Sequence, residues 1–124
     1  MRRYASLRGR RDFALVLRRG RASSTKHLVI FTLRPSTARE AARVGIVITK
    51  KVGTAVERNR LRRRCKAILD QSAIGDSRLW YVVQFRPAAA QLSYQQLAAQ
   101  LQTVLATSLR AAGEAGRPRE IVSS

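Results

Sequence analysis

RVGIVITKKVGTAVERNRLRRRCKAILDQS, residues 43–72, decides the fold, because its pattern changes from that of a strand to that of a helix. Residues 43–49 are mostly apolar and β-branched, which is typical of a buried strand. From residue 54 to residue 72 apolar side chains recur at steps of three and four, which predicts a helix between Gly53 and Gly75. Its buried face consists of Leu61, Cys65, Ile68, Leu69 and Ser72. The stretch therefore predicts a strand that leads into an amphipathic helix.

Two further elements follow this unit downstream. Residues 78–85 are rich in aromatic and β-branched side chains and end before Pro87, so they predict a strand. Residues 93–112 carry an apolar stripe at helical spacing and begin with Ser93, a good N-cap residue. This segment predicts a long amphipathic helix that packs on a sheet.

The upstream segments complete the fold class. Residues 26–33 predict a strand, which we expect to pair with strand 43–49 as an antiparallel hairpin. Residues 11–19 predict a short helix, and residues 20–25 a short strand at the sheet edge. The order helix, two or three strands, helix, strand, helix predicts an α+β fold, a two-layer sandwich with helices on a small mixed sheet.

The length of the chain, 124 residues, fits one domain. We assign residues 1–112 to a single domain. Residues 113–124 contain glycine, proline and two terminal serines without periodicity, so we expect a disordered tail.

The charge of the chain points to a polyanionic partner. Twenty-five Lys and Arg against seven Asp and Glu give a formal net charge of +18. Such self-repulsion destabilises a compact fold unless a polyanion relieves it, and nucleic acid is the leading partner. No apolar stretch is long enough to span a bilayer, so we expect no membrane partner.

The cysteine and histidine content limits the chemistry and indicates a compartment. The single Cys65 excludes an intrachain disulfide, which favours a reducing, cytoplasmic location. Residues 1–24 are rich in arginine, a composition that a mitochondrial presequence shares, although Phe13, Val16 and Leu17 fit a folded helix. We interpret Cys65 as a small buried hydrophobe, and His27 lacks partners for a catalytic dyad or a zinc site.

The densest positive charge lies between residues 50 and 66, a segment with eight basic residues and a single acidic residue, Glu57. A solvated helix face normally mixes acids with bases, whereas here like charges crowd together at an energetic cost. This favours phosphate binding over a merely solvated face. The basic residues are Lys50, Lys51, Arg58, Arg60, Arg62, Arg63, Arg64 and Lys66.

These motifs resemble the bacterial ribonuclease P protein subunit. The resemblance is carried by RVGI at 43–46, KKVGTAV at 50–56 and RNRLRR at 58–63, and it extends from about Leu7 through Leu109. It implies a left-handed crossover from strand 43–49 to strand 79–85, against the general right-handed rule. It also implies that this chain helps a catalytic RNA to remove the 5′ leader from precursor tRNA.

The resemblance assigns two binding surfaces. The first binds the RNA subunit, and together with the charge cluster it comprises Lys50, Lys51, Arg58, Asn59, Arg60, Arg62, Arg63 and Lys66. The second is a cleft for the precursor leader, comprising Arg11, Phe13, Leu17 and Phe31. Leu17 departs from the aromatic residue often found there in the family, so one stacking platform is missing. An apolar residue on a helix or strand is more often core, and only the resemblance favours binding for Phe13 and Phe31.

The resemblance places catalysis in the RNA, with no catalytic residue in this chain. It implies a 1:1 complex with the RNA subunit, precursor tRNA as substrate, and Mg²⁺ held mainly by the RNA. One alternative is an independent nuclease, but the acids are scattered and form no tight motif for metal-assisted hydrolysis. Another is a structural or ribosome-associated RNA-binding protein, which composition alone does not exclude.

Overall fold

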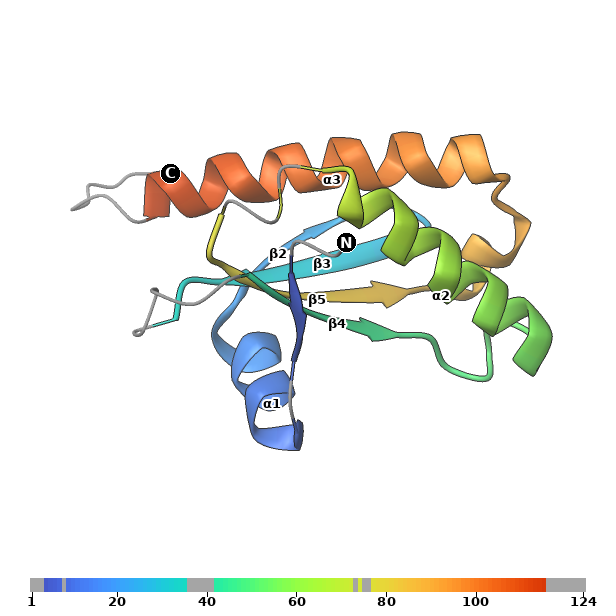
Figure 1. Ribbon diagram of the computed structural model, residues 1–124, viewed down its shortest axis with the longest axis horizontal. Helices are drawn as coiled ribbons and strands as arrows, with labels where there is room; N and C mark the ends of the chain where they lie inside the picture. Colours follow the sequence, from blue (N-terminus) through green and yellow to red (C-terminus); the bar gives the residue numbers. More distant parts are fainter. Residues whose placement is uncertain (1–3, 8, 36–41, 73, 75–76, 116–124) are drawn as a thin grey trace.

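The computed structural model describes residues 4–7, 9–35, 42–72, 74 and 77–115. Five strands form one sheet in the order β1-β4-β5-β3-β2, and three α-helices pack on it (Figure 1). The elements are β1 (Ala5–Ser6), α1 (Gly9–Arg19), β2 (Arg21–Ser24), β3 (Leu28–Leu33), β4 (Arg43–Val47), α2 (Ala55–Asp70), β5 (Trp80–Phe85), the 3₁₀ helix η2 (Pro87–Gln91) and α3 (Tyr94–Ala115). The α+β class and the small mixed sheet are confirmed.

The predicted hairpin between strands 26–33 and 43–49 is wrong. β5 lies between β3 and β4, antiparallel to β3 and parallel to β4. Burial explains the central position: Tyr81, Val82 and Val83 are all fully buried, so β5 needs cover on both faces and a neighbour on both edges.

The predicted edge strand is confirmed, since β2 pairs antiparallel with β3. β1, a two-residue strand parallel to β4, was not predicted because two residues carry no periodic pattern.

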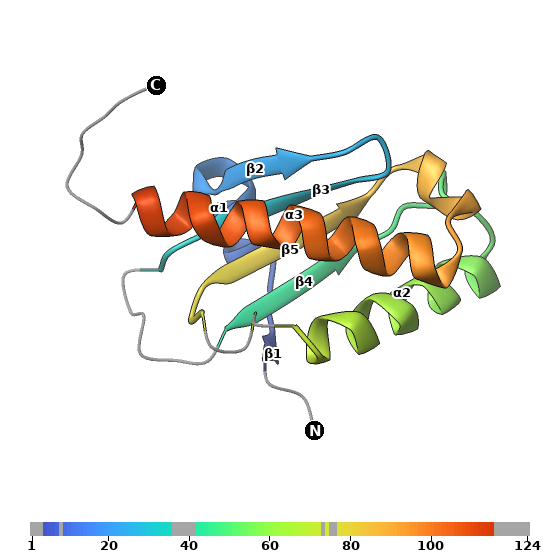
Figure 2. The same cartoon turned by 90° about the horizontal axis from the view of Figure 1, so that it is seen from above.

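The crossover β4–α2–β5 joins two parallel strands. In Figure 2 both strands run to the right, β5 lies above β4, and α2 lies on the viewer's side with α3. This arrangement is left-handed, as the resemblance implies and against the general rule for such units.

The helices divide between the two faces of the sheet, so α1 adds a third layer to the predicted two (Figure 1). α2 and α3 cover one face with the main core, which includes Leu61, Cys65 and Leu101. α1 lies across the other face over a smaller core of Leu7, Val16 and Val82. The second face is only partly covered, and it remains available for a ligand.

Both long helices begin with a capping box. Thr54 Oγ1 accepts from Glu57 N at 3.2 Å, and Glu57 Oε1 accepts from Thr54 N at 2.8 Å. Ser93 and Gln96 exchange the same pair of bonds, which confirms the predicted cap of α3. α3 continues to Ala115, beyond the predicted end at residue 112. The rest of the predicted tail, residues 116–124, lies outside the described residues.

Candidate nucleic-acid interface

The first candidate surface is the cationic side of α2. Its buried stripe of Leu61, Cys65, Ile68 and Leu69 faces the main core, as predicted. Ser72, also predicted on this face, lies beyond the end of α2 and is only half-buried. The stripe turns the outer side of the helix toward solvent, where Asn59 and Arg63 are exposed. The exposed members of the predicted RNA-subunit surface are Lys50, Lys51, Asn59, Arg60 and Arg63, and the half-buried members are Arg58, Arg62 and Lys66.

Two of these arginines hydrogen-bond within the protein. Arg58 Nε donates to Gly53 O at 3.2 Å, which ties the first turn of α2 to the preceding loop. Arg62 Nη1 donates to Ile46 O at 3.1 Å and so reaches β4. The exposed Arg63, by contrast, makes no hydrogen bond or ion pair with any described residue. The cluster thus contains arginines with internal partners and arginines that face only solvent.

Arg62 hydrogen-bonds to the edge of β4 beyond the end of β1. The carbonyls of Ala42 and Val44 accept from the amide of Ala5 in β1 and from that of Leu7 just after it. Ile46 O is the next carbonyl on that edge of β4, two residues on, and Arg62 fills the position that a longer β1 would occupy. An unpaired carbonyl on a partly buried strand edge costs free energy, so Arg62 stabilises the edge of β4.

Replacing Arg62 with alanine is expected to lower the free energy of unfolding by about 1.5 kcal/mol, because a charge-assisted hydrogen bond to Ile46 O is lost. Arg63→Ala is the matched control, since it removes the same charge from the exposed side of the same helix. Denaturant unfolding of both variants without RNA measures the difference. Equal stability of the two variants would contradict a structural role for Arg62.

The second candidate surface lies between α1 and the sheet, where the resemblance implies a cleft. Phe31, Val82 and Gly45 are direct neighbours across β3, β5 and β4, and the ring of Phe13 lies against Gly45. Phe13 and Phe31 are half-buried, and both pack against the smaller core. Two strand spacings separate Phe31 from Gly45, about 10 Å. The two aromatic side chains therefore stand at opposite ends of one row, with Val82 between them.

The floor of the cleft continues into the next row on the same face. Ser24, Val29, Gln84 and Val47 are neighbours across β2, β3, β5 and β4, each two residues from its counterpart in the Phe31 row. Gln84 and Val47 are half-buried, and Ser24 is exposed. The row joins an apolar floor to an amide that can donate and accept hydrogen bonds.

The other predicted cleft residues lie on α1. Leu17 is one turn after Phe13 and is 42% exposed. Arg11 is exposed but lies two residues before Phe13, and residues at that spacing do not face each other on a helix. Arg10, three residues before Phe13 and also exposed, is the basic residue that shares its side. A leader contact by Arg11 stays a prediction.

Comparison with known proteins decides the family, because the model of the Ribonuclease P family matches residues 1–108. The chain belongs to the ribonuclease P protein family. A relative from Acidothermus cellulolyticus, named ribonuclease P protein component, is 39% identical over 100 residues, which cover 80% of this chain and 83% of the relative.

Solved structures of ribonuclease P proteins have the same fold. The Staphylococcus aureus protein aligns with a TM-score of 0.73 at 22% identity, over 82% of this chain and 93% of that one. The Thermotoga maritima protein aligns with a TM-score of 0.68 at 25% identity, over 85% and 96% of the two chains. The TM-scores confirm the mixed sheet and its three helices as a ribonuclease P protein fold.

The structure of this ribonuclease P protein adds a polar group that links α1 to the sheet. Arg43 Nη1 lies 3.9 Å from Asp12 Oδ2, and its guanidinium is 5.5 Å from the centre of the Trp80 ring. Arg43 and Trp80 are direct neighbours on β4 and β5. Sequence reasoning missed this group because it paired strand 43–49 with the wrong partner. The parallel register 43↔80 is the signal that would have revealed it.

Cys65 is confirmed as a core residue. It is fully buried, and burial raises the pKa of its thiol to about 12, so the thiol stays protonated at neutral pH.

The residues that the structure describes contain no group of three or more His, Cys, Asp or Glu side chains that could hold a metal ion. None of the described helices combines the length and hydropathy that crossing a bilayer requires.

Proposed function

We propose that the chain, as the protein component of ribonuclease P, binds the catalytic RNA through α2 and the 5′ leader of precursor tRNA in the cleft beside α1. Binding both at once promotes endonucleolytic removal of the leader. The observation that carries this proposal is the separation of the two surfaces. α2 covers one face of the sheet, and α1 leaves part of the other face open (Figure 1).

The exposed cations of α2 and the preceding loop support the contact with the RNA subunit. Lys50 and Lys51 precede the helix, and Arg60 and Arg63 lie along it. Glu57, the single acid in this segment, is engaged in the capping box, and the hydrogen bonds from Thr54 lower its pKa. The acid therefore stays ionised and stabilises the helix start, while the arginines remain available for phosphate.

The cleft suits a single-stranded leader. Phe13 and Phe31 are both only half-buried, so part of each ring remains open for a base to stack on. Phe31 and Phe13 supply the aromatic ends, and Gln84 supplies a hydrogen-bonding group in the floor. The exposed Arg10 and Arg11 add positive charge for the leader backbone.

The chemical step belongs to the RNA subunit in this proposal. Mg²⁺ would be held mainly by RNA phosphates, and the protein would contribute positive charge and leader binding. We further propose a 1:1 complex with the RNA subunit, acting in the cytoplasm on precursor tRNA.

Reconstitution at low Mg²⁺ tests the proposed function. We expect precursor tRNA to be cleaved at the mature 5′ end when the purified chain and the RNA subunit of the same bacterium are both present. Either component alone is expected to give little or no cleavage, because the RNA then lacks the cations that compensate for scarce Mg²⁺. Cleavage by the protein alone would contradict the proposal. An RNA-bound protein without effect on cleavage would instead indicate a purely structural RNA-binding role.

A further inference from the structure

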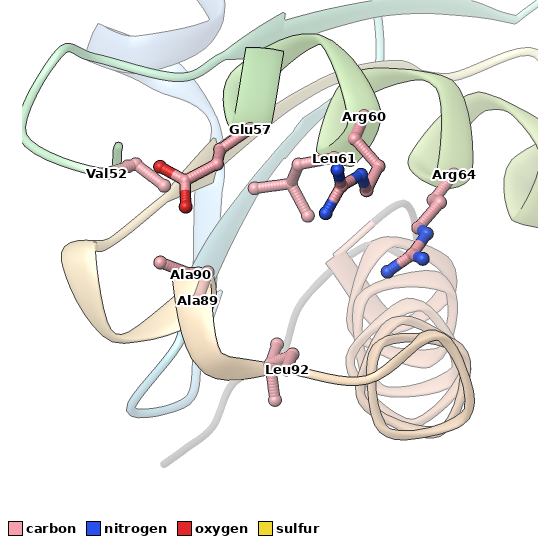
Figure 3. Close-up of a pocket in the computed structure, with 8 residues that line it drawn as sticks. All are labelled: Val52, Glu57, Arg60, Leu61, Arg64, Ala89, Ala90 and Leu92. Carbon is pink, nitrogen blue, oxygen red and sulfur yellow. The ribbon is translucent and has the colours of Figure 1, made fainter. Parts of the chain in front are cut away.

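A hollow lies between α2 and η2, on the flank of α2 away from Arg62 and β4. Its floor is apolar and comes from Val52, Leu61, Ala89 and Leu92. Figure 3 shows the side chains of Arg60 and Arg64 extending from α2 on the same side as Leu61, with η2 opposite. The hollow encloses about 460 Å³, including the part open to solvent.

The rim of this hollow is cationic, and one of its arginines lies over an aromatic ring next to it. Arg60 is exposed, and the half-buried guanidinium of Arg64 lies 5.9 Å from the centre of the Tyr94 ring. Tyr94 is itself 42% exposed, so part of its ring is open to solvent. Glu57 also lines the hollow, but its carboxylate accepts the Thr54 amide in the capping box. The two guanidinium groups thus leave the rim positive.

We propose that this hollow, the α2–η2 pocket, binds one unstacked nucleotide of the RNA subunit, with its base on the apolar floor and its phosphate on Arg60. The proposal rests on the proposed contact between α2 and the RNA. Proteins read structured RNA largely at splayed-out bases, which stack on aromatic rings or arginine planes. A guanidinium grips a phosphate with two parallel hydrogen bonds. An apolar floor beneath a pair of arginines offers both interactions to one nucleotide.

The pocket differs from a simple charged face in what it selects. Phosphate contacts on the exposed side of α2 add affinity without requiring any base to leave its stack. A pocket with an apolar floor gains affinity only when a base enters it. The RNA would therefore contact α2 on its outer face and, through one base, on the flank next to η2.

Filling the pocket without changing its charge tests the proposal. Ala90 lines the pocket from η2 and is exposed, so Ala90→Leu places three more carbons in it and retains both arginines. We expect Ala90→Leu to weaken binding to the RNA subunit about five-fold while the dependence of affinity on salt stays unchanged. Gln91→Leu is the matched control, since it adds an apolar side chain at the neighbouring exposed residue, outside the pocket, and is expected to bind like the wild type. An equal loss in both variants would overturn the proposal.

Chemical probing gives a second readout that does not depend on affinity. Dimethyl sulfate and a carbodiimide together modify the Watson–Crick edges of all four bases. With saturating protein, one base of the RNA subunit is expected to be protected by the wild type and exposed by Ala90→Leu. Arg60→Gln is expected to expose the same base, and it keeps the test valid if Ala90→Leu does not fold. A pattern of base modification that is the same for the wild type and both variants would overturn the proposal that the pocket binds a base.

Arg63→Ala separates this proposal from the function on which it rests. Arg63 faces solvent on the outer side of α2, so its loss is expected to reduce the log–log salt slope by about 0.7 to 0.9 if it meets one phosphate. A reduced slope with Ala90→Leu unchanged would overturn the pocket alone. Unchanged binding in Arg63→Ala, Arg60→Gln and Ala90→Leu would remove α2 from the RNA contact, and the pocket with it.

Discussion

Replacing Gly45 with alanine is expected to lower the free energy of unfolding by about 2 kcal/mol and to weaken binding of precursor tRNA. A Cβ atom at position 45 would overlap the ring of Phe13 and would lie 3.1 Å from Leu7 Cδ1. The ring is packed against the smaller core, so it must move away from the sheet. Overpacking of this kind typically costs about 1–3 kcal/mol. The displaced ring would also enter the space that the leader is proposed to occupy.

A double-mutant cycle isolates this contact. Phe13→Leu shortens the side chain, and the pair Gly45→Ala with Phe13→Leu is expected to recover at least half of the stability that Gly45→Ala loses. Denaturant unfolding of the wild type, both single variants and the double variant measures the coupling. Strictly additive losses would show that the alanine at position 45 clashes with something other than Phe13.

The elements of this fold could be predicted from local pattern, but their pairing could not. Strand and helix periodicities placed β3, β4, α2, β5 and α3 within a few residues of their observed bounds. Pairing depends on which strand needs cover on both faces, and the decisive burial of Tyr81, Val82 and Val83 arises only when both helix layers are present. The left-handed crossover has no local signal at all, and only the family resemblance implied it.

The candidate site was predictable to a similar degree. The resemblance identified the residue types that meet RNA, but it did not separate Arg62, which donates to Ile46 O, from the exposed Arg63. That difference arises because β1 stops after two residues and leaves one carbonyl of β4 without a strand partner. The hollow beside η2 was equally invisible, since it brings together segments that lie about thirty residues apart in the sequence.

The cleft yields the second large effect. Phe31→Ala is expected to weaken binding of precursor tRNA to the assembled enzyme about ten-fold, equivalent to about 1.4 kcal/mol. The reason is that one stacking surface of the Phe31–Val82–Gly45 row is lost, and stacking contributes about 1–3 kcal/mol per base. Mature tRNA has no leader, so its binding is expected to stay nearly unchanged. Equilibrium binding of both RNAs to the reconstituted enzyme measures the difference.

Leu33→Ala is the matched control for this prediction. Leu33 is also half-buried on β3 and packs against the same small core, but it neighbours Trp80, two residues along β3 from Phe31. It therefore shares the stability cost of Phe31→Ala without the proposed leader contact. Both variants must be compared below their unfolding transitions, since loss of a core side chain weakens every function through instability.

Leu17 allows the same cleft to be tested in the direction of gain. It is 42% exposed and lies one turn after Phe13, so a phenyl ring at this position meets no core side chain that it must displace. Leu17→Phe is expected to strengthen precursor binding several-fold by adding a stacking surface, again with mature tRNA unaffected. Together the two substitutions test the cleft from both sides, because Phe31→Ala removes a stacking surface from the sheet and Leu17→Phe adds one on α1. If a folded Phe31→Ala protein loses equal affinity for precursor and mature tRNA, and Leu17→Phe gains none, the leader does not run between α1 and the sheet.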